Sequence, residues 1–123
     1  MYNLQRFLKA QEYTYDQILQ EVKDGKKVSH WVWYIFPQMK GLGKSERSQF
    51  YGIQGREEAE AYISNPLLRD RLVEICKAVL DNQVSVYEIF GNDAIKVRSC
   101  VLLFASVSDE PVFKQLISKY KWK

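Results

Sequence analysis

The chain has 123 residues, of which 46% are hydrophobic and 27% are charged, and its 18 Lys and Arg against 15 Asp and Glu give a formal charge of +3. A chain of this length buries about two-thirds of its surface on folding, which argues against disorder and for a single globular helical domain over residues 1–123. No apolar run reaches the roughly 20 residues of a membrane-spanning helix, and residues 1–12 lack the apolar segment of a signal peptide. We therefore expect a cytoplasmic protein with no membrane partner.

Two helices are predicted near the N-terminus. Apolar residues at one-face spacing follow Asn3, which can cap the first helix. Thr14 and Gln17 stand in the relation of a capping box at the start of the second helix, and Gly25 ends it. Together the two segments form a helical hairpin.

A short run of aromatic and β-branched residues follows at positions 30–36. Its composition suits either a buried strand or a buried helix, because periodicity alone does not separate the two. We favour a helix, since a lone strand would find no partner in this chain for its backbone hydrogen bonds. Core packing is favoured for the large rings of this run, and a pocket or an interface for one pair of them is the alternative. These rings belong to Trp31, Trp33, Tyr34 and Phe36.

The rest of the chain also has helical periodicity, with glycines and prolines between the segments. Four apolar residues spaced 4, 3 and 4 apart make the helix after Pro66 amphipathic. The helix that Asp93 is predicted to cap has so little polar face that we place it at the centre of the core. Further helices are predicted after Ser45, Gly55, Ser85 and Pro111. The fold class is therefore all-α, a compact bundle of about seven to nine helices, several of them short, with no substantial sheet.

The glycine-containing segment 41–45 carries a possible chemical motif. It ends in Gly-Lys-Ser, as a phosphate-binding loop does, but Gln38 occupies the position of the required first glycine. A nucleoside triphosphatase is therefore disfavoured. Two interpretations remain: an anion bound by the free N–H groups of a glycine turn that leads into a helix, and a plain loop with Ser45 as a helix cap.

His30 is the only histidine, and its side chain is the one expected to titrate near neutral pH. It is either a proton-transfer group or a structural residue at a helix start. Because there is no second histidine and no cysteine pair at ligand spacing, we predict no metal site and no cofactor. Cys76 and Cys100 lie in apolar stretches and are expected to be buried, unreactive thiols.

Lys96 and Arg98 lie in the first turns of the helix after Asp93, where the helix dipole disfavours cations. We therefore expect a negative group near them. It is either an acidic residue such as Glu88 or Asp109, or the phosphate or carboxylate of a ligand.

Basic residues at the C-terminal end alternate with Tyr120 and Trp122, a pattern that could follow single-stranded nucleic acid by stacking and phosphate contact. The net charge of +3 is far below that of typical nucleic-acid-binding domains. A solvated, charged tail is the favoured interpretation, and a nucleic-acid partner is disfavoured.

Residues 29–38, Ser-His-Trp-Val-Trp-Tyr-Ile-Phe-Pro-Gln, together with Gly41, Leu42, Gly43 and Ser45, resemble an uncharacterised, mainly bacterial family of small proteins that is sometimes labelled calpastatin. Further matching segments cover nearly the whole chain, at residues 3–7, 58–67, 89–91, 96–99 and 109–113. The resemblance implies a compact multihelical fold and no established activity. The calpastatin label conflicts with this composition, because that class of inhibitor is disordered.

Our first functional hypothesis is a pocket for an anionic, nucleotide-like or phosphorylated small molecule. It requires residues 30–45 to meet residues 96–99 in space. If the protein is an enzyme, we expect a hydrolase or transferase acting on a phosphate- or ribose-bearing substrate. The candidate catalytic residue is His30, and the candidate ligand-binding residues are Trp33, Gln38, Gly41, Gly43, Ser45, Lys96, Arg98 and Ser99.

The second hypothesis is a non-enzymatic interaction module in which the aromatic run at 31–36 docks a partner protein or a second copy of the chain. A monomer and a homodimer are both compatible with the sequence. Nucleic-acid binding through the basic C-terminal end is the third and most remote alternative.

Overall fold

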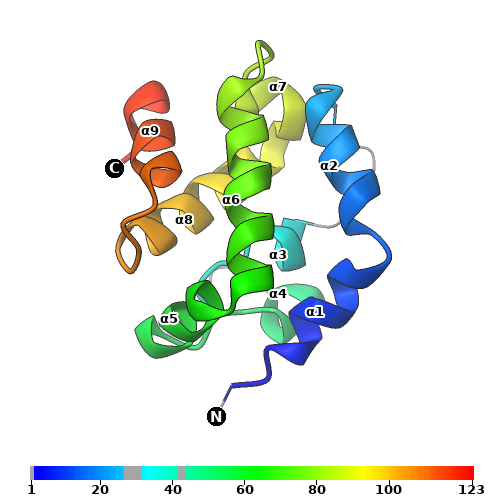
Figure 1. Cartoon of the computed structure of the whole chain (residues 1–123), viewed down its shortest axis with the longest axis vertical. Coiled ribbons are helices and arrows are strands. Elements are labelled where there is room, and N and C mark those ends of the chain that lie inside the picture. The colour runs from blue at the N-terminus through cyan, green and yellow to red at the C-terminus, as the bar shows by residue number, and fades with distance from the viewer. Residues whose placement is uncertain (1, 27–31, 42–43) are drawn as a thin grey trace.

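A computed structural model describes residues 2–26, 32–41 and 44–123, and within these residues the fold is all-α, as predicted. Strand-like pairing in these ranges is limited to one isolated parallel bridge between Met39 and Ile53. No helix of the described residues is long and apolar enough to cross a membrane. The α-helices, in chain order, are α1 (Gln5–Glu12), α2 (Tyr15–Lys23), α3 (Val32–Ile35), α4 (Glu46–Phe50), α5 (Arg56–Ser64), α6 (Pro66–Asp81), α7 (Val86–Phe90), α8 (Ala94–Ala105) and α9 (Pro111–Tyr120) (Figure 1).

Side chains cap three of the helices, and the cap predicted at Ser45 is one of them. The hydroxyl of Ser45 accepts a hydrogen bond from the first turn of α4, and the hydroxyl of Ser85 does the same for α7. The side-chain oxygen of Asn65 accepts two N–H groups at the start of α6, where Pro66 occupies the first helical position. Each cap satisfies N–H groups that lack a partner inside the helix.

Three other predicted caps are wrong. The residue before α1 is Leu4, so Asn3 does not cap it. The hydroxyl of Thr14 donates to the carbonyl oxygen of Ala10 in the preceding helix, 2.7 Å away, and makes no cap for α2. Asp93 makes no side-chain cap for α8. In the last two cases the side chain bonds a neighbour on the preceding or following turn in place of the free N–H groups.

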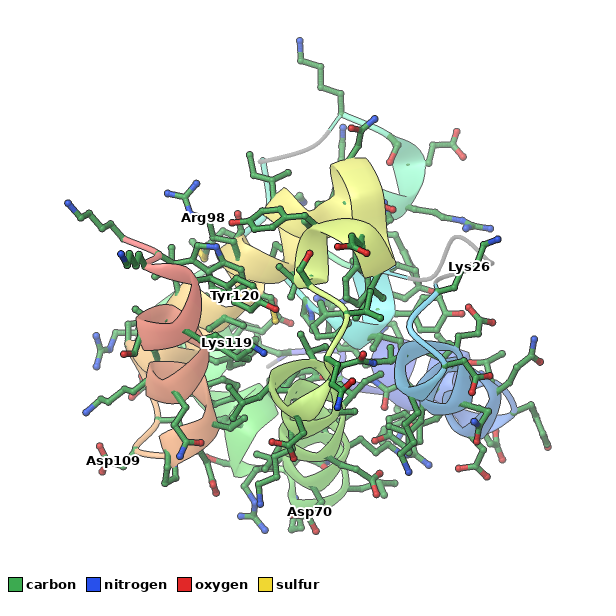
Figure 2. The ribbon with its side chains drawn as sticks, turned by 90° about the horizontal axis from the view of Figure 1, so that it is seen from above. Lys26, Asp70, Arg98, Asp109, Lys119 and Tyr120 are labelled. Carbon is green, nitrogen blue, oxygen red and sulfur yellow. The ribbon has the colours of Figure 1, made fainter. Side chains whose placement is uncertain are left out.

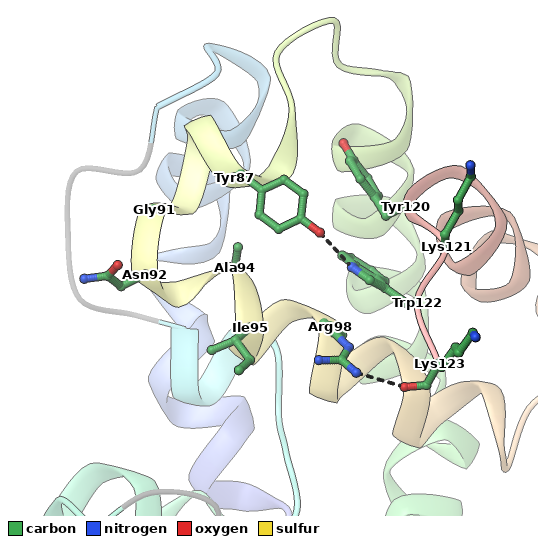
Figure 3. Close-up of a pocket in the computed structure, with 10 residues that line it drawn as sticks. All are labelled: Tyr87, Gly91, Asn92, Ala94, Ile95, Arg98, Tyr120, Lys121, Trp122 and Lys123. Carbon is green, nitrogen blue, oxygen red and sulfur yellow. Dashed lines mark hydrogen bonds between the residues drawn. The ribbon is translucent and has the colours of Figure 1, made fainter.

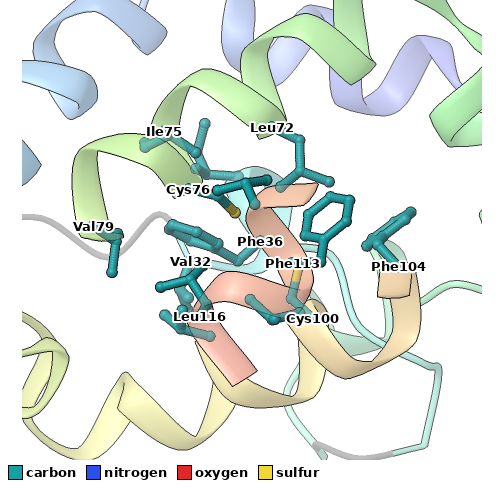
Figure 4. Close-up of a cluster of buried hydrophobic side chains, with 14 of the residues drawn as sticks. Val32, Phe36, Leu72, Ile75, Cys76, Val79, Cys100, Phe104, Phe113 and Leu116 are labelled. Atoms are coloured by element: carbon teal, nitrogen blue, oxygen red, sulfur yellow. The ribbon is translucent and has the colours of Figure 1, made fainter. Parts of the chain in front are cut away.

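The longest helix, α6, organises the packing. It lies in the middle of the view with α2 on one side and α9 on the other, and α8 passes behind it (Figure 1). Every described helix except α4 contributes buried apolar side chains to one cluster. Phe36, directly after α3, meets residues of α6, α8 and α9 in this cluster (Figure 4). The residues of these three helices include Leu72, Ile75, Cys76, Cys100, Phe104, Phe113 and Leu116.

Tyr62 of α5 is the largest fully buried side chain among the described residues. Its ring meets Phe7 of α1 edge-on, with 5.0 Å between ring centres, and lies 5.3 Å from the ring of Phe104 in α8. Its hydroxyl accepts a hydrogen bond of 3.2 Å from the side-chain amide of Gln11. The buried polar group is therefore paired, and the ring joins the N-terminal helix to α8.

Candidate functional site

A pocket of about 420 Å³ lies where the segment around α3 and α4 meets the first turns of α8. Its volume is within the range of small-molecule sites. It contains two lysines, and none of the described residues that line it carries a carboxylate. We call it the Trp33 pocket, and it is lined by Trp33, Gln38, Lys44, Ser45, Ile95, Lys96 and Ser99.

Gln38 is the buried polar residue of the Trp33 pocket, with 3% of its surface exposed. Its carbonyl oxygen accepts the N–H of Ile53 at 2.8 Å, and the carbonyl of Ile53 accepts the N–H of Lys40 at the same distance. This fixes the backbone of Gln38. Its side-chain nitrogen Nε2, in contrast, is buried without a hydrogen-bond partner among the described residues. A buried amide nitrogen in this state is uncommon in folded proteins.

The backbone pairing beside Gln38 depends on a glycine. A Cβ on Gly52 would lie 2.7 Å from the Cα of Lys40. No side chain fits at that distance from a backbone atom, so the two segments approach this closely only because position 52 has none.

The loop between α4 and α5 is held by a buried ion pair. A guanidinium nitrogen of Arg6 lies 2.9 Å from a carboxylate oxygen of Glu58, and the two side chains are 6% and 0% exposed. Arg6 also donates to the carbonyl oxygens of Phe50 and Gly52, and the other oxygen of Glu58 accepts the N–H of Gln54 at 2.7 Å. Helices α1 and α5 therefore fix this loop, and the loop fixes Gln38.

Lys96 is held in the Trp33 pocket by two neighbours. Its Nζ lies 2.7 Å from a carboxylate oxygen of Asp93 and 4.6 Å from the centre of the Trp33 ring. The expected negative partner is therefore present, but it is Asp93 and neither Glu88 nor Asp109. A residue three positions earlier lies on the same face of a helix, within reach of a lysine, and an ammonium over an indole ring is electrostatically favourable.

The two serines of the pocket each make one local hydrogen bond. Ser45 Oγ accepts the N–H of Ser48 at 3.1 Å, and Ser99 Oγ donates to the carbonyl oxygen of Ile95 at 3.0 Å. A hydroxyl both donates and accepts, so Ser45 keeps its proton and Ser99 keeps its acceptor capacity for a ligand.

The sequence model of the family described as "Protein of unknown function (DUF1810)" matches residues 1–122. The chain belongs to the DUF1810 family. It is also similar to the crystal structure of the conserved hypothetical protein Rv1873 from Mycobacterium tuberculosis, with a TM-score of 0.93 and 40% sequence identity over 98% of this chain and 89% of that chain. Comparison with curated proteins gave no match.

In this DUF1810 protein, Arg98 lies outside the Trp33 pocket, contrary to our placement of it there. Its Nη2 donates to the main-chain oxygen of Lys123 at 3.0 Å, and the side chain lines a second hollow (Figure 3). Residues two positions apart on a helix point about 200° apart, so Lys96 and Arg98 face different sides of α8. Lys96 and Ser99, three positions apart, share a face.

The glycine turn and the histidine are described only in part. Gly41 has a positive φ of 98°, which suits a turn, but it does not line the Trp33 pocket. His30, Trp31 and Gly43 lie outside the described residues. The roles assigned to His30 and Gly43 therefore stay predictions.

The described aromatic residues between 32 and 36 divide between core and pocket. Phe36 is fully buried, and the ring of Tyr34 packs 5.5 Å from that of Tyr51. Trp33 is half-buried and lines the Trp33 pocket. Core packing is thus confirmed for Phe36, and the pocket alternative describes Trp33.

Two residues that line the Trp33 pocket are absent from the sequence-based selection. Lys44 is the lysine of the Gly-Lys-Ser motif and directly precedes Ser45. Ile95 precedes Ser99 by four positions and therefore lies on the same helical face. Lys44 could have been identified from its place in the Gly-Lys-Ser motif, and Ile95 from its position on the same helical face as Ser99.

The C-terminal aromatic residues are packed against α7, so the description of this end as a solvated tail is wrong for Trp122. Trp122 is 6% exposed, and its indole N–H donates to the hydroxyl of Tyr87 at 3.2 Å. Its ring stacks on Tyr120, 5.1 Å away, and the hydroxyl of Tyr120 accepts the N–H of Val86 at 3.0 Å.

Both thiols of this DUF1810 protein are free and fully buried, as predicted. Burial raises the pKa of Cys76 and of Cys100 well above the ordinary value for a thiol. We expect neither thiol to react with Ellman's reagent at pH 8 in the folded protein, and both to react in concentrated urea. Rapid labelling of the folded protein at a rate independent of urea would contradict this.

The same shift makes the free energy of unfolding depend on pH. The folded state keeps both protons at pH values where the thiols of an unfolded chain, with a pKa of about 8.5, lose them. The contribution of thiol burial to stability is therefore complete below this pH and decreases as the pH rises above it.

Proposed function

We propose that this protein binds a small phosphorylated, nucleotide-like ligand in the Trp33 pocket. The observation that carries the proposal is the side-chain nitrogen of Gln38, which is buried without a partner among the described residues in a pocket that also contains two lysines.

The amide of Gln38 supports a ligand with acceptor atoms. A buried donor without a partner costs a protein about 1–3 kcal/mol relative to a satisfied one. A phosphate or ribose oxygen would accept its N–H groups and remove that cost on binding. The surrounding backbone pairing holds Gln38 in place before a ligand arrives.

The two lysines support a negative charge on the ligand. Lys44 is exposed and makes no ion pair with any other described residue. Lys96 is oriented by Asp93, whose carboxylate does not itself line the pocket. Lysine binds phosphate as a compact point charge, which suits a pocket whose cations come from two separate segments.

Trp33 supports a ring on the ligand. It is half-buried at the wall of the pocket, and the ammonium of Lys96 fixes it from above. An exposed aromatic face stacks on a nucleobase with little dependence on its identity. A ring joined to a phosphate, as in a nucleotide, therefore matches the pocket better than inorganic phosphate alone.

Catalysis is an extension of this proposal and rests on His30. This residue lies three positions before Trp33, and its imidazole is the side chain that exchanges a proton most readily near neutral pH. A hydrolase or transferase would lose turnover in a His30→Gln variant while keeping its affinity for the ligand. Unchanged turnover in that variant would remove His30 from the mechanism.

The proposal is tested by thermal shift and calorimetry with AMP, GMP, ribose 5-phosphate and inorganic phosphate. A ligand at 100 times its Kd adds about 2.7 kcal/mol to stability, which is several degrees in Tm for a domain of this size. We expect the nucleotides to stabilise the protein, and Lys96→Met to weaken their binding at least tenfold. Lys114→Met removes an exposed lysine of α9 and should leave binding unchanged.

Gln38→Met separates binding from folding. The thioether fills a similar volume and removes the unpaired amide, so the ligand-free variant should unfold at the same temperature as the parent or higher. Its affinity for the nucleotides should fall at least tenfold. Full affinity in both Gln38→Met and Lys96→Met would overturn the proposed function.

A further inference from the structure

We infer that the Trp33 pocket is one half of a longer binding surface along α8, and that this surface takes a ligand with two ring-bearing halves joined by an anionic linker, the chemical class of a dinucleotide. The inference rests on the proposed function for its first half. Its second half is the hollow beside Trp122.

This second hollow, which we call the Trp122 pocket, has a volume of about 500 Å³. It contains three cationic side chains and three aromatic rings, and none of the described side chains that line it is acidic (Figure 3). Its chemistry is therefore similar to that of the Trp33 pocket. The cations are Arg98, Lys121 and Lys123, and the rings are Tyr87, Tyr120 and Trp122.

One side chain separates the two pockets. Ile95 lines both of them, and it is 60% exposed on the surface of α8. Lys96 belongs to the pocket on one side of Ile95, and Arg98 belongs to the pocket on the other side. A ligand that fills both pockets must cross Ile95, and its linker then passes between an ammonium and a guanidinium.

The Trp122 pocket is organised before any ligand binds. Its tryptophan is held by the hydrogen bond to Tyr87 and by stacking on Tyr120, which leaves the half-exposed ring of Tyr87 as the face that a ligand can reach. Arg98 uses one N–H for the main-chain oxygen of Lys123, and a guanidinium has further donors for a phosphate. Arg98 and Tyr120 lie close together at one side of the molecule, away from Lys26 (Figure 2). Because these side chains are already held by their neighbours, a ligand loses less free energy in ordering them when it binds.

The test compares a mononucleotide with its own dimer. AMP has one ring and one phosphate, and diadenosine diphosphate joins two such halves through a pyrophosphate. Linking two bound groups makes the second contact intramolecular and raises the affinity without any new kind of contact. By calorimetry we expect diadenosine diphosphate to bind with one molecule per chain and at least 30-fold more tightly than AMP.

Two variants locate the second half of the site. Arg98→Ala should reduce the affinity for diadenosine diphosphate to that for AMP and leave AMP binding unchanged. Ile95→Glu places a carboxylate on an exposed position of the shared wall, so we expect the variant to fold and to bind the dimer at least tenfold more weakly. The Tm of each ligand-free variant confirms that it is folded, and Lys114→Met is the control for a lost charge.

The outcomes separate the two proposals. Equal affinities for AMP and its dimer, or two dimers bound per chain, overturn the two-pocket inference and leave the proposed function intact. An equal loss of AMP and dimer binding in Arg98→Ala also overturns it. No binding of either compound to the parent protein overturns the proposed function for adenine nucleotides and the inference with it.

Discussion

Glu58→Gln is expected to lower the free energy of unfolding by about 3–5 kcal/mol, because it leaves a buried arginine without its counter-charge. The carboxylate is fully buried and has two partners, Arg6 and the N–H of Gln54. An amide of the same shape can accept from one of them but then directs its own N–H groups at the other. The guanidinium of Arg6 has no route to water, since it is itself buried.

Urea unfolding monitored by circular dichroism measures this loss. The matched control is Glu60→Gln in the same helix, where the carboxylate is 52% exposed and lies 3.9 Å from Arg56. An exposed pair of this kind contributes about 0.2–1 kcal/mol. Equal, small losses in the two variants would show that the buried pair does not hold the loop. Because this loop fixes Gln38, nucleotide affinity should fall in Glu58→Gln and stay unchanged in Glu60→Gln.

Phe104→Ala is expected to cost about 3–5 kcal/mol, the usual range for removing a buried aromatic ring. The ring lies 5.3 Å from that of Tyr62 and 6.2 Å from that of Phe113, so α5, α8 and α9 all lose contacts with it. Because protein interiors are closely packed, the neighbouring side chains can move only slightly into the cavity that the missing ring leaves.

Equilibrium unfolding in urea gives this value as well, and a constant slope against urea would show that the two-state transition is retained. Leu103→Ala is the control, since Leu103 is the adjacent residue of α8 and is only half-buried. We expect its loss to be less than half that of Phe104→Ala. A cost below 1 kcal/mol for Phe104→Ala would place the centre of the core elsewhere.

The helix starts that could be predicted from sequence are those decided within one turn. Asn65 and Pro66 supply a cap and a first helical residue in consecutive positions, and Ser45 and Ser85 reach N–H groups three residues ahead. Two of the three caps that failed, at Thr14 and Asp93, concern side chains with a second partner nearby. For Asp93 that partner is the ammonium of Lys96, which attracts a carboxylate more strongly than a backbone N–H does.

The support of the candidate site could not be predicted, because its partners are distant in sequence. Arg6 and Glu58 are 52 residues apart, and the pairing of Gln38 with Ile53 joins two segments that show no strand pattern. Nothing local marks Gly52 as the point where two backbones meet. Such contacts depend on how whole helices pack against one another. Composition and periodicity do not predict that packing.

The site itself was predicted in part. Gln38 and Ser45 follow from a local motif, Trp33 from the aromatic run and Lys96 from an unfavourable position of charge at a helix start, while Ser99 was added as a further donor. The structure brings these five residues to one pocket. Arg98 was grouped with Lys96 by closeness in sequence. The angle between helix positions two residues apart already separates them, so this error came from treating neighbours along the chain as neighbours in space.

Helix α8 is both the outer wall of the pockets and a central part of the interior. Ile95, Lys96 and Ser99 lie along the side of α8 that lines the Trp33 pocket, and Val97, Cys100 and Phe104 are buried on the other. A ligand held by these residues would therefore also stabilise the helix that carries much of the core. Amide hydrogens on the buried side of α8 that exchange only by global unfolding should then be protected by the ligand, together with those beside the pocket.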